Sequence, residues 1–251
     1  MLHGQFPEEL KNTLIFPVFK KGDPKKILNY RPIAILSSIE KVLERTVYDA
    51  VYKHVRPQLS DIQHGFLKGK STVTNLLDHS HDIIQAFNRN SQMDVLYTDM
   101  SKAFDKVNHI LLLNKLQKFG IKDQLLNWFN TYLMNRPLEV VFNGEVSDVF
   151  IATSGVPQGS ILGPLLFLLY IDDISSNIAS STSLYADDMK LSYCIEDTQS
   201  GNQLQNDIAS IQNWCNENSL PLNETKCVIA SFTTKKNTDY VFVSYERNEH
   251  A

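Results

Sequence analysis

Two tetrapeptides of this 251-residue chain place a tyrosine two residues before a pair of aspartates, Tyr170–Asp173 (Tyr-Ile-Asp-Asp) and Tyr185–Asp188 (Tyr-Ala-Asp-Asp). Adjacent carboxylates repel each other unless a cation lies between them, so each pair is a candidate cation site. The first pair ends an apolar run, 160–171, that we expect to be a helix. A helix C-terminus favours cations over carboxylates, so we expect this pair to mark the exit of the chain to solvent.

The second tetrapeptide lies between segments that alternate apolar and polar residues, and the whole stretch 183–195 is typical of a β-hairpin. Tyr185–Asp188 would form its tip, where both carboxylates are held rigidly and stay exposed. A solvated acidic turn is the alternative for an isolated pair of this kind.

Asp99 supplies a third carboxylate, because it directly follows a run of strand type, 93–98. If that strand lies beside the hairpin, three carboxylates converge from two neighbouring elements. Such a set suits hard cations with oxygen ligands, hence Mg²⁺. Two such ions ~4 Å apart can activate an attacking 3′-hydroxyl and stabilise leaving pyrophosphate, which is the chemistry of nucleotidyl transfer.

The elements that must position these residues follow from periodicity and turn residues. An Asn143-Gly144 pair between two strand-like runs predicts a second hairpin, because both residues tolerate positive φ. The helical patterns cover 38–52, a segment that begins at Ser71-Thr72, 110–119, 122–134, 160–171 and 204–215. The strand-like runs cover 14–19, 93–98, 138–142, 146–152, 183–195 and 228–232. This mixture predicts an α+β fold, with a mostly antiparallel sheet and helices on one face.

Three of the expected helices carry apolar residues at helical spacing, along one side of each helix, and the last of the three is amphipathic. In the first these are Ile39, Val42, Leu43, Thr46 and Val47. In the second they are Val73, Leu76, Leu77, Ile83, Ile84 and Phe87. In the last they are Leu204, Ile208, Ile211 and Cys215.

Composition indicates a folded chain with an uneven charge distribution. Hydrophobic residues make up 43% and charged residues 21%, and the longest apolar run is shorter than the ~20 residues of a membrane helix. No signal peptide is visible and three cysteines lack metal-site spacing, so we expect an intracellular protein of nucleus or cytoplasm. Residues 1–70 carry a charge of +5 and residues 71–251 carry −9, which sum to −4. A basic front part could meet phosphates.

The chain resembles the reverse transcriptases of non-LTR (LINE-like) retrotransposons from about Pro7 to Phe232. The resemblance depends on motifs in a fixed order: Phe16–Asp23, Asn29–Ile33, Gln63–Phe66 with Gly69–Thr72, Asp99–Asp105, Ser154–Ser160, Tyr185–Asp188 and Leu222–Lys226. It implies the right-hand fold of polymerases, with residues 1–92 mainly fingers and 93–235 mainly palm. The palm sheet would be antiparallel and backed by helices, and the 110–153 helices and hairpin would be inserted in it.

The same resemblance implies what this chain lacks. It begins just before the first fingers motif and ends soon after Phe232, so we expect the upstream endonuclease and the downstream thumb to be missing. Residues 236–251 stay an unassigned tail. A polymerase without a thumb would grip a primer–template poorly, because that grip is electrostatic and spread over many contacts.

The metal and sugar-selecting residues follow from the resemblance as well. Asp99, Asp187 and Asp188 resemble the catalytic carboxylates that hold two Mg²⁺ ions, with Mn²⁺ as a substitute, and Asp99 and Asp187 would be the stronger ligands. Phe104 resembles the steric gate that excludes a ribose 2′-hydroxyl. The alternative for Phe104 is core packing.

Five further residues resemble groups that bind the incoming nucleotide. Lys20 and Arg31 would hold its triphosphate, although either could be a solvated cation. Gln158 and Gly159 would pass under the nascent base pair, where glycine allows close approach. Lys226 would protonate the leaving pyrophosphate or act as a simple countercharge.

Four residues resemble a template-contact segment: Gln63, Gly65, Phe66 and Lys68. A surface turn is the rival interpretation of that segment.

The resemblance predicts a fragment of an RNA-directed DNA polymerase that uses an RNA template, a DNA primer and deoxynucleoside triphosphates, away from membranes. One alternative is an inactive or repurposed remnant that at most binds RNA. Another is an RNA-dependent RNA polymerase, against which Phe104 speaks. The oligomeric state does not follow from the sequence.

Overall fold

The computed structural model describes residues 4–196 and 198–234, and the chain divides into two compact units. The first unit comprises Met1–Leu59 and Lys102–Ile171, and the second comprises Ser60–Ser101 and Asp172–Ala251. These divisions do not coincide with the boundary expected between residues 92 and 93, and the assignment of fingers and palm stays a prediction. The expected tail, 236–251, lies outside the described residues.

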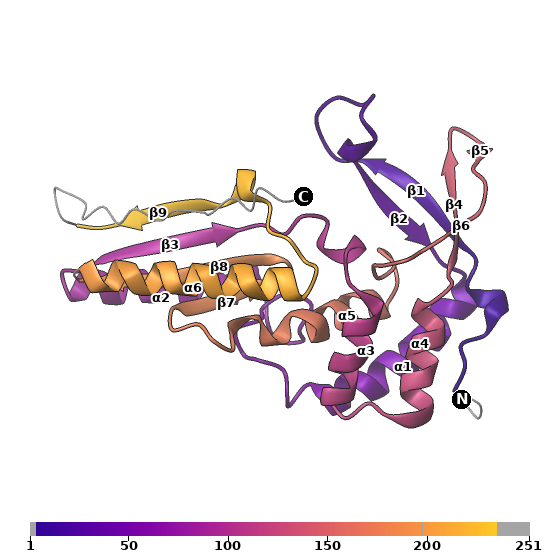
Figure 1. Cartoon of the computed structure of the whole chain (residues 1–251), viewed down its shortest axis with the longest axis horizontal. Helices are drawn as coiled ribbons and strands as arrows, with labels where there is room; N and C mark the ends of the chain where they lie inside the picture. Colours follow the sequence, from indigo (N-terminus) through magenta and orange to yellow (C-terminus); the bar gives the residue numbers. More distant parts are fainter. Residues whose placement is uncertain (1–3, 197, 235–251) are drawn as a thin grey trace. The chain divides into compact units, whose positions relative to one another are not determined.

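The first unit combines a small sheet with four helices (Figure 1). Its strands are β1 (Thr13–Phe19), β2 (Tyr30–Ile35), β4 (Pro137–Phe142), β5 (Glu145–Val146) and β6 (Phe150–Ile151). Its helices are α1 (Ser38–Val55), α3 (His109–Lys118), α4 (Asp123–Leu133) and α5 (Leu162–Ile171), with short 3₁₀ helices at Glu8–Leu10, Ile27–Asn29 and Ala103–Asp105. The strand order is β2-β1-β4-β5, β6 also pairs with β4, and β1 and β4 are parallel.

Two predictions for this unit are confirmed. The hairpin around Asn143-Gly144 joins β4 to β5, and the φ angles of its turn residues are 52° and 86°. The apolar run became α5, which packs against both α1 and α3 and has nearly every residue buried. A helix that is apolar on all sides belongs in the core.

Helix α1 turns a different face to the core from the one that its apolar residues predict. Ile39 and Val42 are each 70% exposed, whereas Glu40 and Glu44 are fully buried. Burial of Glu40 is possible because Arg136 Nη1 donates a hydrogen bond to its Oε1 at 3.0 Å. A buried carboxylate needs such a partner, and the partner here comes from a distant part of the chain.

Glu44 is buried in the same way. Its Oε1 accepts the hydroxyl of Tyr132 at 2.5 Å, and its Oε2 accepts the backbone N–H of Ile161 at 2.7 Å. Burial raises the pKa of both Glu40 and Glu44, although these contacts oppose the shift. Polar contacts therefore help to set the orientation of α1. Of its apolar stripe, Val47 is buried as the pattern indicates, whereas Ile39 and Val42 are exposed.

The second unit is built on a four-stranded antiparallel sheet of order β7-β8-β3-β9. Its strands are β3 (Gln92–Thr98), β7 (Ser181–Tyr185), β8 (Asp188–Ile195) and β9 (Val228–Phe232). Its helices are α2 (Thr72–Asn88) and α6 (Thr198–Glu217), with 3₁₀ helices at Asp172–Ser175 and Glu224–Lys226. The predicted strand 93–98 and hairpin 183–195 are both confirmed, and β3 lies between β8 and β9.

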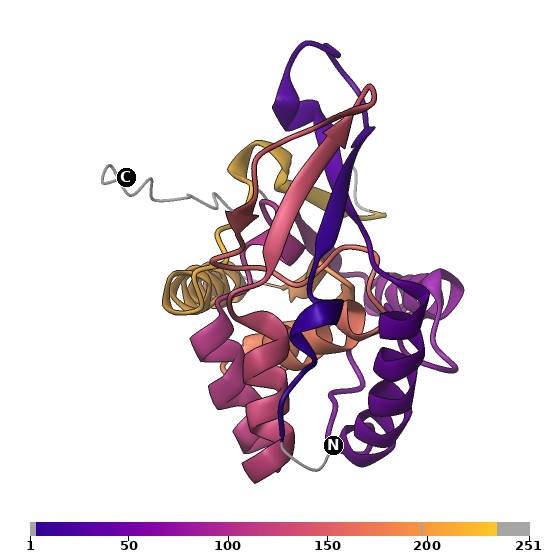
Figure 2. The same ribbon diagram turned by 90° about the vertical axis from the view of Figure 1, so that its right-hand side faces the viewer.

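The two helices lie on opposite faces of this sheet (Figure 2), so the expected arrangement on one face is wrong. On one face Met93 and Val95 of β3 pack with Ala86 of α2. On the other face Leu96 is also buried, and α6 packs against β8. Both sets of alternating residues in β3 are therefore covered, which explains why the strand is almost continuously buried.

Helix α2 also departs from the pattern of its apolar residues. Its N-terminus is fixed as predicted, because Ser71 and Thr74 form a reciprocal capping box. The buried residues are Asn75 and Ala86, so a polar side chain faces the sheet. Four of the apolar residues at helical spacing are instead more than half exposed: Val73, Leu76, Leu77 and Ile84.

Candidate functional site

The tetrapeptide Tyr185–Asp188 is the tip of the β7–β8 hairpin. Tyr185 pairs with Asp188, so Ala186 and Asp187 are the two turn residues. Ala186 has a φ of 56°, which the tight turn requires. Asp187 is half-buried and Asp188 is exposed, so both carboxylates lie at the end of the sheet rather than in its core.

Asp99 lies next to this turn. Strands β3 and β8 pair in register from Gln92 to Thr98, and Thr98 faces Met189. Continuing the register by one residue sets Asp99 opposite Asp188. The expectation that the strand before Asp99 runs beside the hairpin is confirmed.

Lys226 lies against Asp99. Its ammonium group forms an ion pair with the Oδ2 of Asp99, with side chains 43% and 23% exposed. The backbone supports this pairing, since Asn223 N–H donates to the carbonyl of Asp99 at 2.7 Å and Met100 forms a bridge with Leu222. The structure thus gives Lys226 a carboxylate partner that the sequence did not indicate.

Asp99, Asp187 and Asp188 offer carboxylate oxygens as ligands for Mg²⁺. Carboxylates are the ligands that Mg²⁺ prefers, and one or two of them suffice when substrate phosphates complete the coordination. Within residues 4–196 and 198–234, however, no three His, Cys, Asp or Glu side chains form a group arranged to hold a metal ion. Carboxylate oxygens therefore suit Mg²⁺, and in this structure the ammonium group of Lys226 is paired with one oxygen of Asp99.

Gln63 braces the turn from inside the unit. Its side chain is 4% exposed, and its Oε1 accepts the backbone N–H of Ala186 at 3.0 Å and of Gly65 at 2.7 Å. Its Nε2 donates to the carbonyl of Ala186 at 3.4 Å. The neighbouring backbone adds to this, because His64 N–H donates to the Leu184 carbonyl at 2.8 Å. Gln63 therefore holds the turn by binding both the backbone N–H and the backbone carbonyl of Ala186.

Gly65 fits closely beneath the same residue. A Cβ atom at this position would lie 2.4 Å from the backbone nitrogen of Ala186. Only a residue without a side chain allows this approach. The other two residues of the predicted template segment, Phe66 and Lys68, are exposed. Contact of all four with a template stays a prediction, and the structure gives Gln63 and Gly65 an additional place against the turn.

A second support comes from Asn75 of α2. Its Nδ2 donates to the hydroxyl of Ser183 at 2.5 Å and to the carbonyl of Leu184 at 3.3 Å. Its Oδ1 accepts the ammonium group of Lys190, whose pKa burial lowers. One buried amide thus ties both strands of the hairpin. Neither Gln63 nor Asn75 was predicted in this role, because hydrogen bonds to backbone leave no periodic signal.

The other tetrapeptide has a structural role. Asp172 Oδ1 accepts the backbone N–H of Ser60 at 2.9 Å. Asp173 Oδ1 accepts the indole N–H of Trp214 at 2.9 Å. Both aspartates are half-buried, and Ser176 and Asn177 after them are exposed, so the chain leaves the core here as expected.

The predicted residues Gln158 and Gly159 lie in the first unit, in the loop before α5. Gln158 Nε2 donates to Asp105 Oδ1 at 2.7 Å. The backbone carbonyl of Gln158 accepts the N–H of Ala34 at 2.7 Å. Gly159 has a φ of 124°, and a Cβ there would lie 2.4 Å from the carbonyl oxygen of Ala34. Glycine does allow a close approach here, and the partner in this structure is strand β2.

Phe104 is half-buried in the first unit. Its ring stacks on Phe167 of α5, with centroids 4.6 Å apart and planes at 18°. Its carbonyl accepts the N–H of Val156 at 2.8 Å. Lys20 and Arg31, at opposite ends of the β1–β2 connection, are both exposed.

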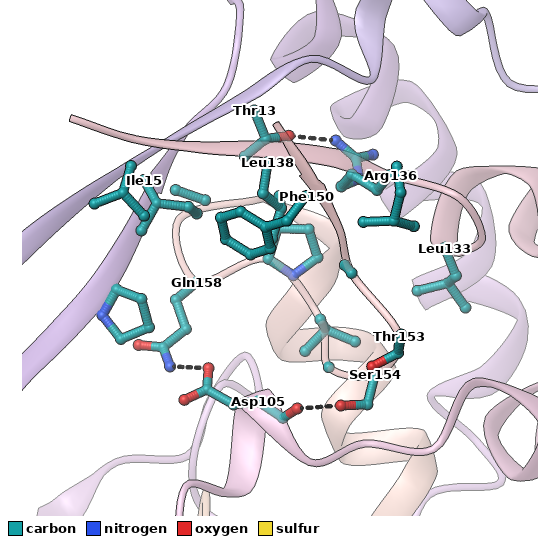
Figure 3. Close-up of a pocket in the computed structure, with 18 residues that line it drawn as sticks. Thr13, Ile15, Asp105, Leu133, Arg136, Leu138, Phe150, Thr153, Ser154 and Gln158 are labelled. Atoms are coloured by element: carbon teal, nitrogen blue, oxygen red, sulfur yellow. Dashed lines mark hydrogen bonds between the residues drawn. The ribbon is translucent and has the colours of Figure 1, made fainter. Parts of the chain in front are cut away.

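A cavity of about 340 Å³ lies in the first unit beside the loop that contains Gln158 (Figure 3). Asp105 and Gln158 lie at one side of it and Arg136 at another, with apolar walls that include Leu138 and Phe150. Burial raises the pKa of Asp105, and the hydrogen bond from Gln158 opposes that shift. This cavity could not be predicted from the sequence, because its walls come from separate elements.

Comparison with known proteins decides the family. A family model described as "Reverse transcriptase (RNA-dependent DNA polymerase)" matches residues 19–245. This chain belongs to the reverse transcriptase family. A probable RNA-directed DNA polymerase from transposon BS of Drosophila melanogaster is 32% identical over 244 residues, which cover 92% of this chain and 27% of that protein. The resemblance to non-LTR elements seen in the motifs is confirmed.

More distant relatives agree. The RNA-directed DNA polymerase from mobile element jockey of Drosophila funebris is 28% identical, over 92% of this reverse transcriptase and 26% of the relative. A Pol polyprotein from the type-1 retrotransposable element R2 of Popillia japonica is 26% identical, and the match covers 91% of this chain and 33% of that protein. The chain thus spans between about a quarter and a third of the length of these relatives.

Solved structures confirm the fold. The apo telomerase of Candida tropicalis truncated from its C-terminal domain superimposes with a TM-score of 0.67 at 13% identity, over 91% of this chain and 52% of that one. The telomerase of the same organism in complex with a fragment of telomeric RNA superimposes with a TM-score of 0.66 at 13% identity. That match covers 90% of this chain and 42% of the telomerase chain. Within the described residues, no helix has the length and apolar character needed to cross a membrane.

Proposed function

We propose that this reverse transcriptase chain contains the fingers and palm of an RNA-directed DNA polymerase, which adds deoxynucleotides to a primer 3′-end on an RNA template. The observation that supports the proposal is that three aspartates occupy neighbouring segments at one end of the β7-β8-β3-β9 sheet. Asp187 lies in the turn, Asp188 opens β8, and Asp99 follows the neighbouring strand. The RNA in the related telomerase structure supports an RNA template.

Asp99 and Asp187 would be the main ligands of two Mg²⁺ ions, with Asp188 beside them. When bound, Mg²⁺ neutralises phosphate charge and makes the attacking hydroxyl more acidic. Gln63 and Asn75 keep the turn in place through their hydrogen bonds. Preorganised carboxylates cost no rearrangement at the moment of reaction, which is how a rigid turn assists catalysis.

Lys226 is the residue that we propose for the leaving group. Its ammonium group pairs with Asp99 in this structure, one of the residues that would hold the metal. It would protonate the leaving pyrophosphate or act as a countercharge to it, as the family motif implies. Phe104, fixed by Phe167, would exclude a ribose 2′-hydroxyl. Lys20, Arg31, Gln158 and Gly159 are the remaining nucleotide contacts that we propose.

Primer extension tests this function. The chain is incubated with an RNA template, a DNA primer, Mg²⁺ and either deoxynucleotides or ribonucleotides. Extension with deoxynucleotides that Asp187→Asn abolishes supports the proposal. Extension with ribonucleotides alone favours an RNA-dependent RNA polymerase. Binding of RNA without extension, which persists after a thumb segment from a relative is appended, favours a remnant without activity.

A further inference from the structure

The loop that joins β1 to β2 carries the most exposed large apolar side chains among the residues that the structure describes. Ile27 is 82% exposed and Leu28 is 73% exposed. They lie next to each other in the 3₁₀ helix Ile27–Asn29, which directly precedes β2 in the loop between β1 and β2 (Figure 1). We call these two side chains the apolar tip. Two adjacent aliphatic side chains held this far into solvent are unfavourable unless a partner covers them.

The shape of the loop is fixed by its own hydrogen bonds. Asp23 Oδ1 accepts the N–H of Lys25 at 2.9 Å, and the Asp23 carbonyl accepts the side-chain amide of Asn29 at 2.8 Å. The hydroxyl of Tyr30 donates to the Pro24 carbonyl at 2.8 Å. The apolar tip is therefore presented on a preformed support, and ordering it on binding would cost little.

Positive charge surrounds this tip. Residues 19–31 contain five cationic side chains and one carboxylate, Asp23, a balance of +4 in a chain whose net charge is −4. All five are exposed, and none is in an ion pair within the described part of the chain: Lys20, Lys21, Lys25, Lys26 and Arg31. A partner of high negative charge is therefore favoured.

We infer that the 20–31 loop is a wedge that separates the strands of a nucleic-acid duplex. Lys21, Lys25 and Lys26 would lie along phosphates, while Ile27 and Leu28 enter the base stack at the junction where the strands part. Aliphatic side chains inserted at a base step unstack it, and neighbouring cations supply the affinity. The inference rests on the proposed function in one respect. It takes the duplex that the wedge opens to be the part of the template that is still base-paired and about to be copied.

An anionic membrane has some of the same chemistry, and the size of the tip favours nucleic acid over it. Two apolar side chains suffice to unstack one base step. An interfacial membrane helix instead buries a longer apolar face, and stable anchoring takes two such attachments. The 3₁₀ helix that carries Ile27 and Leu28 has three residues.

The first test measures unstacking directly. A duplex with a single-stranded overhang carries 2-aminopurine at the junction, and its fluorescence is followed as protein is added. The wild-type chain should raise the signal, and the double variant Ile27→Ser/Leu28→Ser should bind about tenfold more weakly and raise it little. The matched control changes two equally aliphatic exposed residues of α1, Ile39→Ser/Val42→Ser, each 70% exposed, and should behave as wild type.

A charge variant separates the lysines from the apolar tip. Lys25→Gln/Lys26→Gln should weaken binding to single strands and junctions alike. It should also reduce the slope of log affinity against log salt by about 2. Equal junction fluorescence for wild type and the Ile27/Leu28 variant overturns the inference. Loss of binding to phosphatidylserine vesicles in that variant, with no junction signal from the wild type, also overturns it and assigns the tip to a membrane.

The second test links the wedge to copying. Extension is compared on an unpaired RNA template and on the same template folded into a hairpin. The Ile27/Leu28 variant should match wild type on the unpaired template and be about tenfold slower through the hairpin. Equal rates on both templates overturn the wedge while leaving the proposed function intact. Failure of the wild type to extend either template counts against the proposed function, and the fluorescence result then decides the wedge alone.

Discussion

Gly65 lies directly under the catalytic turn that we propose, and adding one methyl group there should disturb it selectively. In Gly65→Ala the new Cβ would lie 2.4 Å from the backbone nitrogen of Ala186 and 3.1 Å from Oε1 of Gln63. Both neighbours belong to the contact that holds the turn. No positive φ is involved at Gly65, so the effect is purely steric.

The size of the displacement follows from ordinary contact distances. Unstrained Cβ contacts begin at 3.4 Å, so the turn must retreat by 3.4 − 2.4 = 1.0 Å. A 1 Å misplacement of catalytic groups can cost about 100-fold in rate. Forcing a methyl group into a packed site should also lower the free energy of unfolding by about 1–3 kcal/mol.

Gly69→Ala is the matched control. Gly69 has a φ of 85°, and nothing lies within 4 Å of a Cβ placed there. This variant pays about 1–2 kcal/mol of backbone strain without touching the turn. Single-turnover primer extension and urea unfolding are measured for both. We expect Gly65→Ala to lose about 100-fold in rate and Gly69→Ala to keep its rate. Equal rates for the two variants would refute the bracing role of this segment.

Three further predictions test other parts of the account. Phe104→Val should raise ribonucleotide incorporation, measured as the ratio of ribonucleotide to deoxynucleotide extension rates, and unchanged discrimination would exclude the gate. Lys226→Gln removes the cation paired with Asp99, so Mn²⁺ titrated by electron paramagnetic resonance should bind about threefold to tenfold more tightly; unchanged or weaker binding contradicts a metal site at Asp99. Burial lowers the pKa of His109 below 6.5, so the folded chain binds fewer protons than the unfolded chain. The free energy of unfolding should therefore fall as pH drops through 6.5 toward the folded pKa, and His109→Gln should reduce that fall while His81→Gln at an exposed position should not.

The elements that position the carboxylates could be predicted because their signals are local. Alternation identified the hairpin 183–195, and a run of apolar residues before Asp99 identified the neighbouring strand. The choice between two similar tetrapeptides also followed from local pattern, since only the second lies between alternating segments. Period-2 patterning is visible where one face of a strand is buried and the other is exposed.

The buried faces of α1 and α2 could not be predicted in this way, although the four apolar residues expected along one side of α6 are all buried. Arg136 lies 96 residues after Glu40, and Tyr132 lies 88 residues after Glu44. A buried carboxylate looks like a solvated one until its partner is known. The same holds for Asn75, which faces the sheet because it binds Ser183, 108 residues later.

The bracing of the turn was missed for a related reason. Gln63 binds backbone groups of Ala186, 123 residues away, and a backbone group has no sequence identity to detect. The motif around Gly65 was visible as a family feature, and its physical reason appeared only in the structure. Strand β2 escaped prediction as well, because Pro32 interrupts its pattern.

We propose that the carboxylates of the second tetrapeptide, and not those of the first, catalyse nucleotidyl transfer. The most direct measurement compares Asp187→Asn with Asp173→Asn in Mg²⁺-dependent primer extension by the wild-type chain and both variants. Asp187→Asn should slow extension by about three orders of magnitude. Asp173→Asn should keep the wild-type rate, because asparagine still accepts the indole N–H of Trp214. Wild-type extension by Asp187→Asn would contradict the account.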